Sequence, residues 1–405
     1  MNKNLLIVFI ITLQVILWGC SNNNEEPIFE TTLQMSVRSS SLKINEKEAI
    51  SIADRFLNKK STRFGSPVYP SSEYIISDVK TRFSSDSDTI AYIFNYPNDE
   101  GFAIVAAYRI ENPILAFSKR GKFDIENEIV KKYFINNLTL YLESANKRES
   151  INVNEGYLDG CAVVQVDSTL SISQWNPWNK YVIKEHPNCP VGCVAVASAL
   201  AICQTQDSIV YHNSTYQTRQ IYEYLTYGTS STIKGSKHNI SSYAQAVDSM
   251  AKLMYWIGKD VHMKYKEDES SAPSDSAFLL CKSLNLYTPT SFEGYTTDSL
   301  PFLVTYLKQG FIVYLRGTET SGKGGHAWIA DGCMYCYKDP NKKTGIKDIY
   351  LHCNWGWGGI GNGYYIGNIF KIDNPFGNGK INFEVQNYFV LGQKTSGLPL
   401  IPIEI

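Results

Sequence analysis

The stretch that most constrains the fold runs from residue 188 to residue 204 and reads NCPVGCVAVASALAICQ. Pro190 and Gly192 interrupt regular structure just before Cys193, and the residues that follow are small and apolar on nearly every side. A helix that is apolar all round belongs inside a domain rather than on its surface. The pattern therefore predicts a buried helix with Cys193 at or near its first turn.

A cysteine at that position has two interpretations. The free N–H groups and the dipole at a helix N-terminus favour negative charge, which lowers the pKa of a thiol and makes thiolate available near neutral pH. The alternative is that Cys193 is a small buried hydrophobic residue without a chemical role. The local sequence does not separate the two, so the rest of the chain has to decide.

Length and composition bound the class of protein. The chain has 405 residues, enough for two or three domains, and 43% of them are hydrophobic, which is ample for large cores. Its formal net charge of −1 argues against a nucleic-acid partner. The nine cysteines lack the dense, even spacing of a small disulfide-stapled fold, and the sequence does not reveal how they pair.

The N-terminus has the pattern of an export signal. Lys3 precedes a short apolar run over residues 5–18, which is too short to span a bilayer comfortably. The run ends in LWGC at residues 17–20, which resembles the lipobox of bacterial lipoproteins, where the cysteine, here Cys20, carries the lipid. Ser21 after it resembles the outer-membrane address of such lipoproteins. We expect an outer-membrane lipoprotein, or a cell-surface or secreted protein, of a Gram-negative-type bacterium.

The foldable sequence begins at residue 44 with a small mixed domain. Apolar spacing predicts amphipathic helices over residues 45–57 and 125–147. Between them lie four runs with strand character, at residues 73–79, 89–95, 101–107 and 113–118. This α+β domain carries no polar cluster that suggests chemistry of its own.

A second domain begins near Cys161, with helices first and strands after Phe302. The expected helices cover residues 193–202, 243–257 and 274–284. The expected strands cover residues 311–315, 326–330, 349–353, the region of Tyr364, and 383–390. Residues 316–325 are interpreted as a glycine-bearing loop and Asp331-Gly332 as a turn. Helices followed by a twisted antiparallel sheet make a second α+β domain.

A cysteine nucleophile needs a base, a group that orients the base, and donors for the developing oxyanion. His326 follows two glycines and opens an apolar strand, so it is a candidate base, although a lone histidine is more often structural. Residues 354–359, NWGWGG, are too rich in glycine and tryptophan for a routine connection, unless they are a surface turn with packed indoles. Gln174, in QWNPWN at residues 174–179, can offer a side-chain amide to an oxyanion, but alone it is only a turn residue.

Together these segments resemble the streptopain family of bacterial papain-like cysteine proteases. The order and spacing of QWNPWN at 174–179, GCVA at 192–195, GHA at 325–327 and NWGWGG at 354–359 agree with that family. The resemblance implies a papain-like catalytic domain of helices and a twisted antiparallel sheet, acting as a cysteine endopeptidase on protein or peptide substrates. It implies no cofactor and no metal.

The resemblance also implies roles for individual residues. Cys193 would be the nucleophile and His326 its general base and later acid. Gln174 and the Cys193 backbone N–H would form the oxyanion hole. Trp355 would stack near the histidine, and Asn354 lies nearby without a firm orienting role.

The N-terminal domain is similar to the propeptide and inhibitor module of the same family. The similarity rests on IVAA at residues 104–107 and NPILAFS at residues 112–118, while AAYR at residues 106–109 departs from the usual SADDR pattern. It implies a zymogen that its own N-terminal domain inhibits, activated by a cut between residues 145 and 166. The expected parts are a signal peptide (1–20), a tether (21–43), the inhibitor-like domain (44–147), a polar linker (148–160) and the protease domain (161–405).

Two alternatives stay open. Cys333, Cys336, His352 and Cys353 have a spacing that loosely fits a zinc site, although strand alternation would point Cys333 and Cys336 to opposite faces. The chain could also be a surface lipoprotein that uses this fold only to bind. A catalytically dead relative is expected to have lost Cys193 or His326, and this chain keeps both.

Overall fold

The computed structural model describes the chain from residue 43 to residue 404, with interruptions. The longer gaps cover residues 58–74, 81–87, 143–160, 165–169, 231–238, 320–323, 371–382 and 394–401, and the shorter ones fall at residues 111, 128–129, 136, 140, 287, 292 and 340. The expected signal peptide, nearly all of the tether and the linker therefore lie outside the described residues. Within the described ranges, no helix is both long enough and apolar enough to cross a bilayer.

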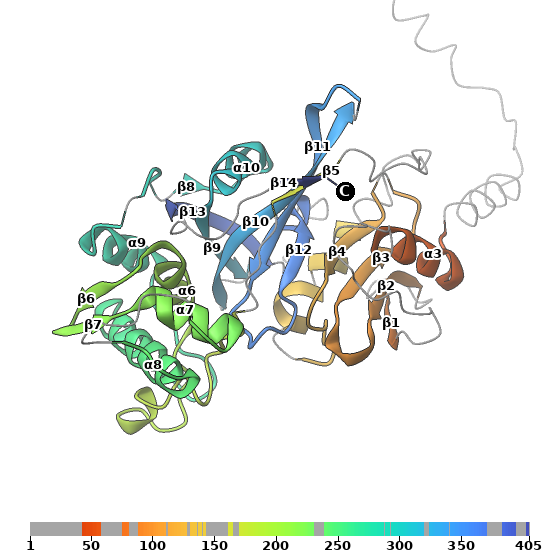
Figure 1. Ribbon diagram of the computed structural model, residues 1–405. Helices are drawn as coiled ribbons and strands as arrows, with labels where there is room; N and C mark the ends of the chain where they lie inside the picture. The colour runs from red at the N-terminus through yellow and green to blue at the C-terminus, as the bar shows by residue number, and fades with distance from the viewer. Residues whose placement is uncertain are drawn as a thin grey trace, which may run out of the picture. The chain divides into compact units, whose positions relative to one another are not determined.

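The helix and strands predicted after residue 44 are present. The helix α3 (Glu46–Leu57) begins where Asn45 Oδ1 accepts a hydrogen bond from the backbone N–H of Glu48 at 2.9 Å, which caps its first turn. The helix buries Ala49 and Ala53 over an antiparallel sheet (Figure 1). The strands of that sheet are β1 (Ile75–Lys80), β2 (Thr89–Asn95), β3 (Phe102–Ala106) and β4 (Ile114–Ser118). The first predicted helix and all four predicted strands are confirmed.

The second predicted helix of this domain begins later than the sequence suggests. Residues 125–127 form a turn, and the described residues from Val130 onward are helical, with a π-helical segment η3 (Lys131–Ile135). Asn127 Oδ1 accepts a hydrogen bond from the backbone N–H of Val130 at 3.3 Å, so the asparagine caps a helix that starts after it. The predicted segment beyond residue 142 lies outside the described residues.

The helical part of the second domain confirms three predictions, since α6 (Cys193–Thr205), α8 (Tyr243–Asp260) and α9 (Ser274–Ser283) all form. The sequence analysis missed the hairpin of β6 (Ile209–Tyr211) and β7 (Ser214–Tyr216), and the helix α7 (Thr218–Tyr227) after it. In Figure 1 these elements gather beside the large sheet.

The prediction of strands from Phe302 onward is wrong for its first residues, because α10 (Leu300–Lys308) occupies them. Leu300, Leu303, Val304 and Leu307 are buried, and their spacing of three and four residues places them on one helical face. The run is apolar enough to be read as a strand, and only this spacing distinguishes the helix.

One sheet joins the two domains. Its strand order is β1-β2-β3-β4-β12-β11-β10-β9-β13-β8, with β5 and β14 attached beside β10. The strands not yet defined are β5 (Cys161–Val164), β8 (Glu293–Gly294), β9 (Phe311–Glu319), β10 (Gly325–Asp339), β11 (Thr344–Asn354), β12 (Gly363–Ile366), β13 (Phe383–Gln393) and β14 (Pro402–Glu404). The described pairings between these strands are all antiparallel, as predicted.

Two local predictions within this sheet are corrected. Residues 316–319 continue β9 as strand instead of forming a loop, because each pairs with β10 or β13. Asp331 and Gly332 are not a turn. They lie inside β10, where the register against β11 shifts between Ala330 and Gly332, which is a β-bulge or irregularity within a longer strand.

Alternating residues of the central strands serve two cores. On β9, Ile312 and Tyr314 pack in the core that contains α6 and α8, whereas Val313 and Leu315 pack in the core that contains α10. This is the alternation expected of a strand covered on both faces. All twelve residues of α6 that follow Cys193 are buried, which confirms the prediction of an interior helix.

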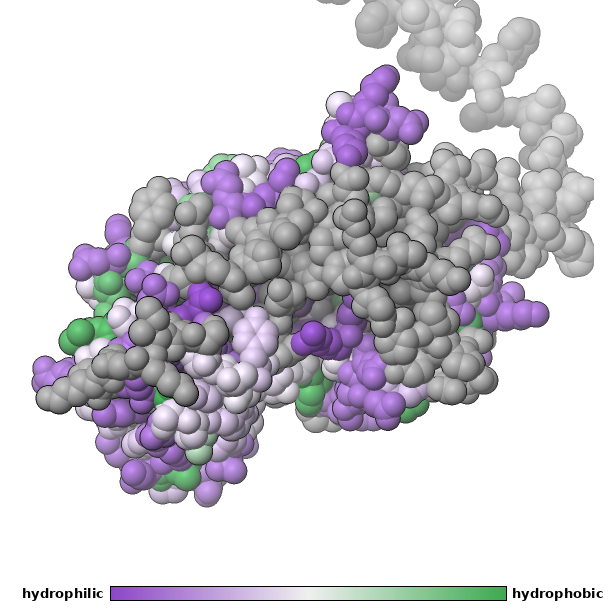
Figure 2. All heavy atoms as spheres, in the orientation of Figure 1, coloured by the Kyte–Doolittle hydropathy of each residue, from purple (hydrophilic) through white to green (hydrophobic). Residues whose placement is uncertain are grey.

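The outer surface offers no broad apolar patch on the face seen in Figure 2. There the hydrophobic side chains of the described residues are scattered among polar ones. The exposed large hydrophobic residues of the described chain lie on several separate elements, such as Val210 on β6, Leu279 on α9 and Phe302 on α10. Scattered apolar residues of this kind are normal for a protein surface.

Candidate functional site

Cys193 is the first residue of α6. Gly192 before it has φ of 95°, and a Cβ atom there would lie 2.6 Å from the side chain of Met263. Only glycine therefore allows the chain to turn into the helix at this point. The rest of α6 is buried in the core, and Cys193 at its N-terminus lines a cavity.

The thiol of Cys193 does not have the low pKa that its position predicts. Burial, with a smaller contribution in the same direction from the nearby Glu269 carboxylate, raises the pKa from 9.0 to about 11. The backbone N–H groups of Ala327 and Val194 and of Cys193 itself act in the expected, lowering direction but are outweighed. In this form of the chain the thiol is therefore protonated at neutral pH.

His326 is the second residue of β10 and is 4% exposed. Its β9 partner in the register is Gly317, and a Cβ atom on the preceding Gly325 would lie 3.2 Å from the Gly317 carbonyl oxygen. The Nε2 atom of His326 is 2.9 Å from the backbone carbonyl oxygen of Trp355, to which it donates a hydrogen bond. With Nε2 as the donor, a neutral ring has Nδ1 as the nitrogen that can accept a proton.

Three indoles surround the imidazole of His326. The ring centroid of Trp357 is 5.1 Å away, that of Trp328 is 5.9 Å away, and that of Trp355 is 6.3 Å away. The Trp328 and Trp355 rings are in turn 4.8 Å apart. An imidazole held between large, buried side chains has few alternative orientations.

The loop that carries Trp355 is held in place by Asn354 and Asn362. Asn354 Nδ2 donates to the Leu170 carbonyl at 2.9 Å, and its Oδ1 accepts from the Gly356 N–H at 3.2 Å. Asn362 Oδ1 accepts from the Trp355 N–H at 3.0 Å. The Asn354 amide thus binds backbone groups, and the atom that contacts the His326 ring is the carbonyl of its neighbour.

Gln174 is brought to the Cys193 segment by its backbone. Its carbonyl oxygen accepts a hydrogen bond from the N–H of Val191 at 2.8 Å, two residues before Cys193. The side chain of Gln174 is not among those that line the cavity over Cys193. The backbone of this residue is therefore near the site, and the role of its amide in an oxyanion hole stays a prediction.

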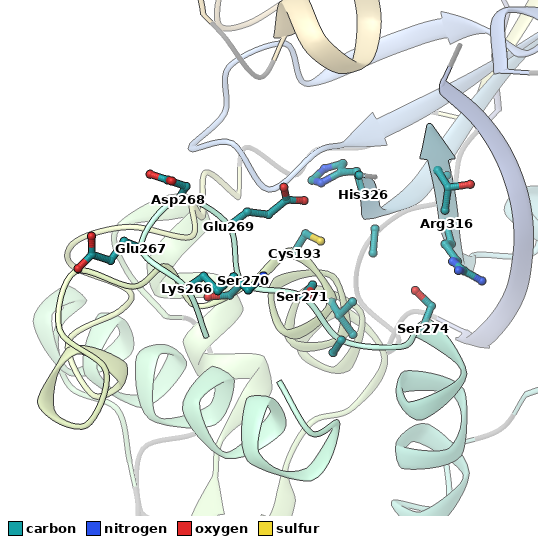
Figure 3. A pocket seen from close by; sticks show the side chains of 17 residues that line it. Cys193, Lys266, Glu267, Asp268, Glu269, Ser270, Ser271, Ser274, Arg316 and His326 are labelled. Atoms are coloured by element: carbon teal, nitrogen blue, oxygen red, sulfur yellow. The ribbon is translucent and has the colours of Figure 1, made fainter. Parts of the chain in front are cut away.

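A cavity of about 410 Å³ contains both Cys193 and His326. Figure 3 shows the two side chains that line it, Cys193 from α6 and His326 from β10. The other walls are residues 266–272 with Ser274, and residues 316–318 with 324–325. Ser270 Oγ donates to the Pro190 carbonyl at 2.8 Å, which ties the first wall to the segment before Cys193.

Two parts of this site escaped the sequence analysis. The Trp355 carbonyl has no signature in the sequence, because any residue supplies a backbone oxygen. Arg316 left a signal that was not used. It follows the apolar run at residues 311–315, where a continued strand would alternate into the core.

The arrangement can perform nucleophilic catalysis. A thiol, a buried imidazole whose Nε2 donates to a carbonyl, and the N–H groups at the start of α6 lie at a single cavity. These are the kinds of group that acyl transfer uses as nucleophile, base and oxyanion donors.

One cysteine of the alternative zinc site is already bonded to another cysteine. Cys336 forms a disulfide with Cys161, and therefore has no thiolate to offer a metal. His352 Nδ1 is 2.6 Å from Asp331 Oδ1. Among the described residues, no group of three or more His, Cys, Asp or Glu side chains is arranged to hold a metal ion.

Comparison with protein families gives two matches. Residues 172–365 match the Peptidase C10 family. Residues 41–147 match the Spi protease inhibitor family.

Individual relatives agree with both matches. The chain is 25% identical over 375 residues to a streptopain of Streptococcus pyogenes serotype M28, covering 79% of this chain and 84% of the relative. Another streptopain of Streptococcus pyogenes is 24% identical over the same length. Among solved structures, a fragment of prointerpain A from Prevotella intermedia superposes with a TM-score of 0.51 at 18% identity, covering 80% of this chain and 100% of the fragment. That superposition supports the fold.

Proposed function

We propose that the chain is a cysteine peptidase of the Peptidase C10 type, which residues 172–365 match, and that it is a lipid-anchored zymogen in which Cys193 and His326 hydrolyse peptide bonds. The observation that carries the proposal is the shared cavity. Two residues from a helix and from a distant strand, each predicted from its own motif, line it together.

The proposed reaction has two halves. His326 Nδ1 takes the proton of Cys193, and the thiolate attacks the substrate carbonyl to give a tetrahedral oxyanion. The imidazolium then donates its proton to the departing amine, which leaves an acyl-enzyme thioester. Water, deprotonated by the same nitrogen, releases the acid and restores the thiol.

The surroundings of His326 support its role in each half. The hydrogen bond from Nε2 to the Trp355 carbonyl keeps Nδ1 as the reacting nitrogen through both halves. The Cys193 N–H at the start of α6 is a donor for the oxyanion. We keep the side-chain amide of Gln174 as the second proposed donor, because its backbone is hydrogen-bonded to Val191, two residues before Cys193.

We propose that the N-terminal domain inhibits through the histidine side of the site. It reaches the loop after Trp355, because the Gly361 N–H donates to the Lys122 carbonyl at 3.0 Å. Tyr365, which follows that loop, packs against Phe134 with ring centroids 5.0 Å apart. A domain held against this loop constrains the carbonyl that orients His326, and small displacements at a catalytic pair carry large losses in rate.

Activation would be a cut in the linker. Because Cys161 is bonded to Cys336 in β10, a cut after Cys161 would leave the N-terminal domain covalently attached. We therefore narrow the predicted region of the activation cut from residues 145–166 to the residues before Cys161.

A cut in this linker would also release the catalytic domain from a lipid on Cys20. If Cys20→Ser protein stayed in the membrane fraction after a high-salt wash, the anchor would lie elsewhere.

The test of the proposed function is Cys193→Ala beside a matched control. Cys189 lies four residues upstream, is buried and does not line the cavity, so Cys189→Ala removes a nearby thiol from outside the site. We expect Cys193→Ala to lose at least about a thousandfold in kcat/KM on a fluorogenic peptide, whereas Cys189→Ala stays within a few-fold of wild type. Comparable losses in both variants, or residual hydrolysis by pure Cys193→Ala protein, would reject Cys193 as the nucleophile.

A further inference from the structure

Arg316 occupies a position at which the sheet pattern calls for an apolar residue. On β9, the residues on the α6 side are Ile312 and Tyr314, and both are fully buried in the apolar core. The next residue on that side, by the alternation of a strand, is Arg316. It is half-buried and lines the wall of the cavity that contains Cys193 and His326.

The guanidinium of Arg316 has little compensation from the described part of the chain. Among the described residues it forms no ion pair, and its one side-chain hydrogen bond is from Nη1 to Asn387 Oδ1 on β13, at 3.5 Å. A guanidinium has five N–H donors in a fixed fork that suits a carboxylate. A half-buried cation with one long neutral contact retains the capacity to bind an anion that enters the cavity.

Arg316 is close enough to the reacting atoms to influence the choice of substrate. Its register partner on β10 is Ala327, the residue after His326, and the Ala327 backbone N–H interacts with the Cys193 thiol. Directly paired residues in a sheet lie about 5 Å apart. A carboxylate bound by Arg316 would therefore lie within about three extended residues of the scissile carbonyl, at about 3.4 Å per residue.

The opposite wall explains why the acidic group would be directed to one end of the cavity. That wall carries Lys266, Glu267, Asp268 and Glu269. In Figure 3 the three acidic side chains lie on one side of Cys193, and Arg316 lies on the other with Ser274. A substrate carboxylate would be repelled near the acidic wall and attracted at the Arg316 end.

We propose that Arg316 determines specificity by binding the carboxylate of a glutamate or aspartate side chain in the peptide substrate, within about three residues of the bond that is cut. This inference rests on the proposed peptidase function. A charge-assisted, bidentate contact in a partly dehydrated pocket gives a preference of about 10- to 100-fold for glutamate over its neutral isostere glutamine. The preference belongs to one position of the peptide.

The kinetic test compares peptides that differ only in Glu or Gln. A positional library scanned with the activated wild-type enzyme identifies the position, and the Glu/Gln ratio of kcat/KM is measured there. We expect Arg316→Gln to bring the ratio close to one, Arg316→Lys to keep part of the preference, and Arg316→Glu to reverse the ratio in favour of Gln. Lys266→Ala, which removes a cation from the opposite and exposed wall, should change the ratio less than about twofold because exposed charges are screened.

Two results would overturn the inference. One is a wild-type enzyme that cuts the paired peptides equally at every position within three residues of the scissile bond. The other is a Glu preference that Arg316→Gln leaves intact or that Lys266→Ala abolishes to the same extent.

A binding measurement keeps this test separate from the peptidase assignment. The full chain with Cys193→Ala is titrated with fluorescent forms of the same Glu and Gln peptides, with and without Arg316→Gln. We expect tighter binding of the Glu peptide, weakened by salt and lost with Arg316→Gln. Selective binding without any Cys193-dependent hydrolysis would retain the anion site and reject the peptidase function. If the enzyme hydrolyses peptides but binds and cuts the Glu and Gln forms equally, the peptidase function is retained and the anion site at Arg316 is rejected.

Discussion

The two halves of the site are supported by different parts of the molecule. Cys193 begins a helix that packs entirely within the core of the catalytic domain, so its position depends on residues after 161. His326 depends on the Trp355 carbonyl and three indoles, and the loop and strand that follow Trp355 touch the N-terminal domain. The position of Cys193 therefore depends on the catalytic domain alone, whereas the position of His326 depends on both the catalytic and the N-terminal domain.

The contacts of β4 with β12 and Tyr350 form the seam between the two domains. Through this seam the N-terminal domain can influence the position of His326. β4 of the N-terminal domain pairs with β12 through Phe117 with Tyr364 and Ala116 with Tyr365. The Phe117 and Tyr364 rings stack at 4.9 Å, and the Tyr350 hydroxyl donates to the Ile114 carbonyl at 2.8 Å. This difference suggests that an inhibitor domain can control a cysteine peptidase by acting on its base while leaving its nucleophile in place.

The largest expected effect tests whether the two halves act as a unit. We expect His326→Ala in the activated enzyme to lose at least about a thousandfold in kcat/KM, close to the loss in Cys193→Ala. The double variant should be no slower than either single one, because removing one partner already disables the pair. A double variant far slower than both single variants would show that the residues contribute independently.

The smallest expected effect tests the seam. Tyr350→Phe removes one buried hydrogen bond to the N-terminal domain, worth about 1 kcal/mol, and should raise the activity of uncut protein about fivefold. The same change in the cleaved enzyme should have little effect, since Tyr350 does not line the cavity. The comparison needs a cleavage-resistant linker, verified by mass. Equal changes in the cut and uncut forms would place the effect inside the catalytic domain.

The sequence predicted the architecture better than it predicted the chemistry of the site. The apolar character of α6 on all sides located that helix, and the spacing of apolar residues located α8 and α9. It failed at α10, where nine largely apolar residues fit a strand as well as a helix, and at residues 316–319, where the strand continues through polar residues. Local patterns carry no information about which neighbours a strand will find.

The pKa of Cys193 shows the same limit. The start of a helix lowers the pKa of a thiol, and this much could be read from PVGC at residues 190–193. How deeply the thiol is packed, and that Glu269 lies near it, depend on chain segments far away in the sequence. Burial and the Glu269 charge, which these distant segments supply, outweigh the backbone N–H groups and raise the pKa of Cys193 above 9.0.

The most direct measurement of the central claim is the alkylation rate of Cys193 as a function of pH, in uncut and cleaved protein. Cys189, Cys203, Cys281, Cys333 and Cys353 are buried, so peptide mapping after a short iodoacetamide pulse can isolate the Cys193 signal. With burial holding the pKa of Cys193 at about 11, only about one uncut molecule in 10⁴ is a thiolate at pH 7. Its rate should rise about tenfold per pH unit up to that pKa.

In the cleaved protein, we expect Cys193 to form a thiolate beside His326. Its alkylation should be rapid at pH 7, and the rate should rise little further at alkaline pH. His326→Ala should return the cleaved protein to the steep profile of the uncut chain. Identical pH profiles before and after cleavage would contradict the claim that the N-terminal domain restrains the histidine side of the pair.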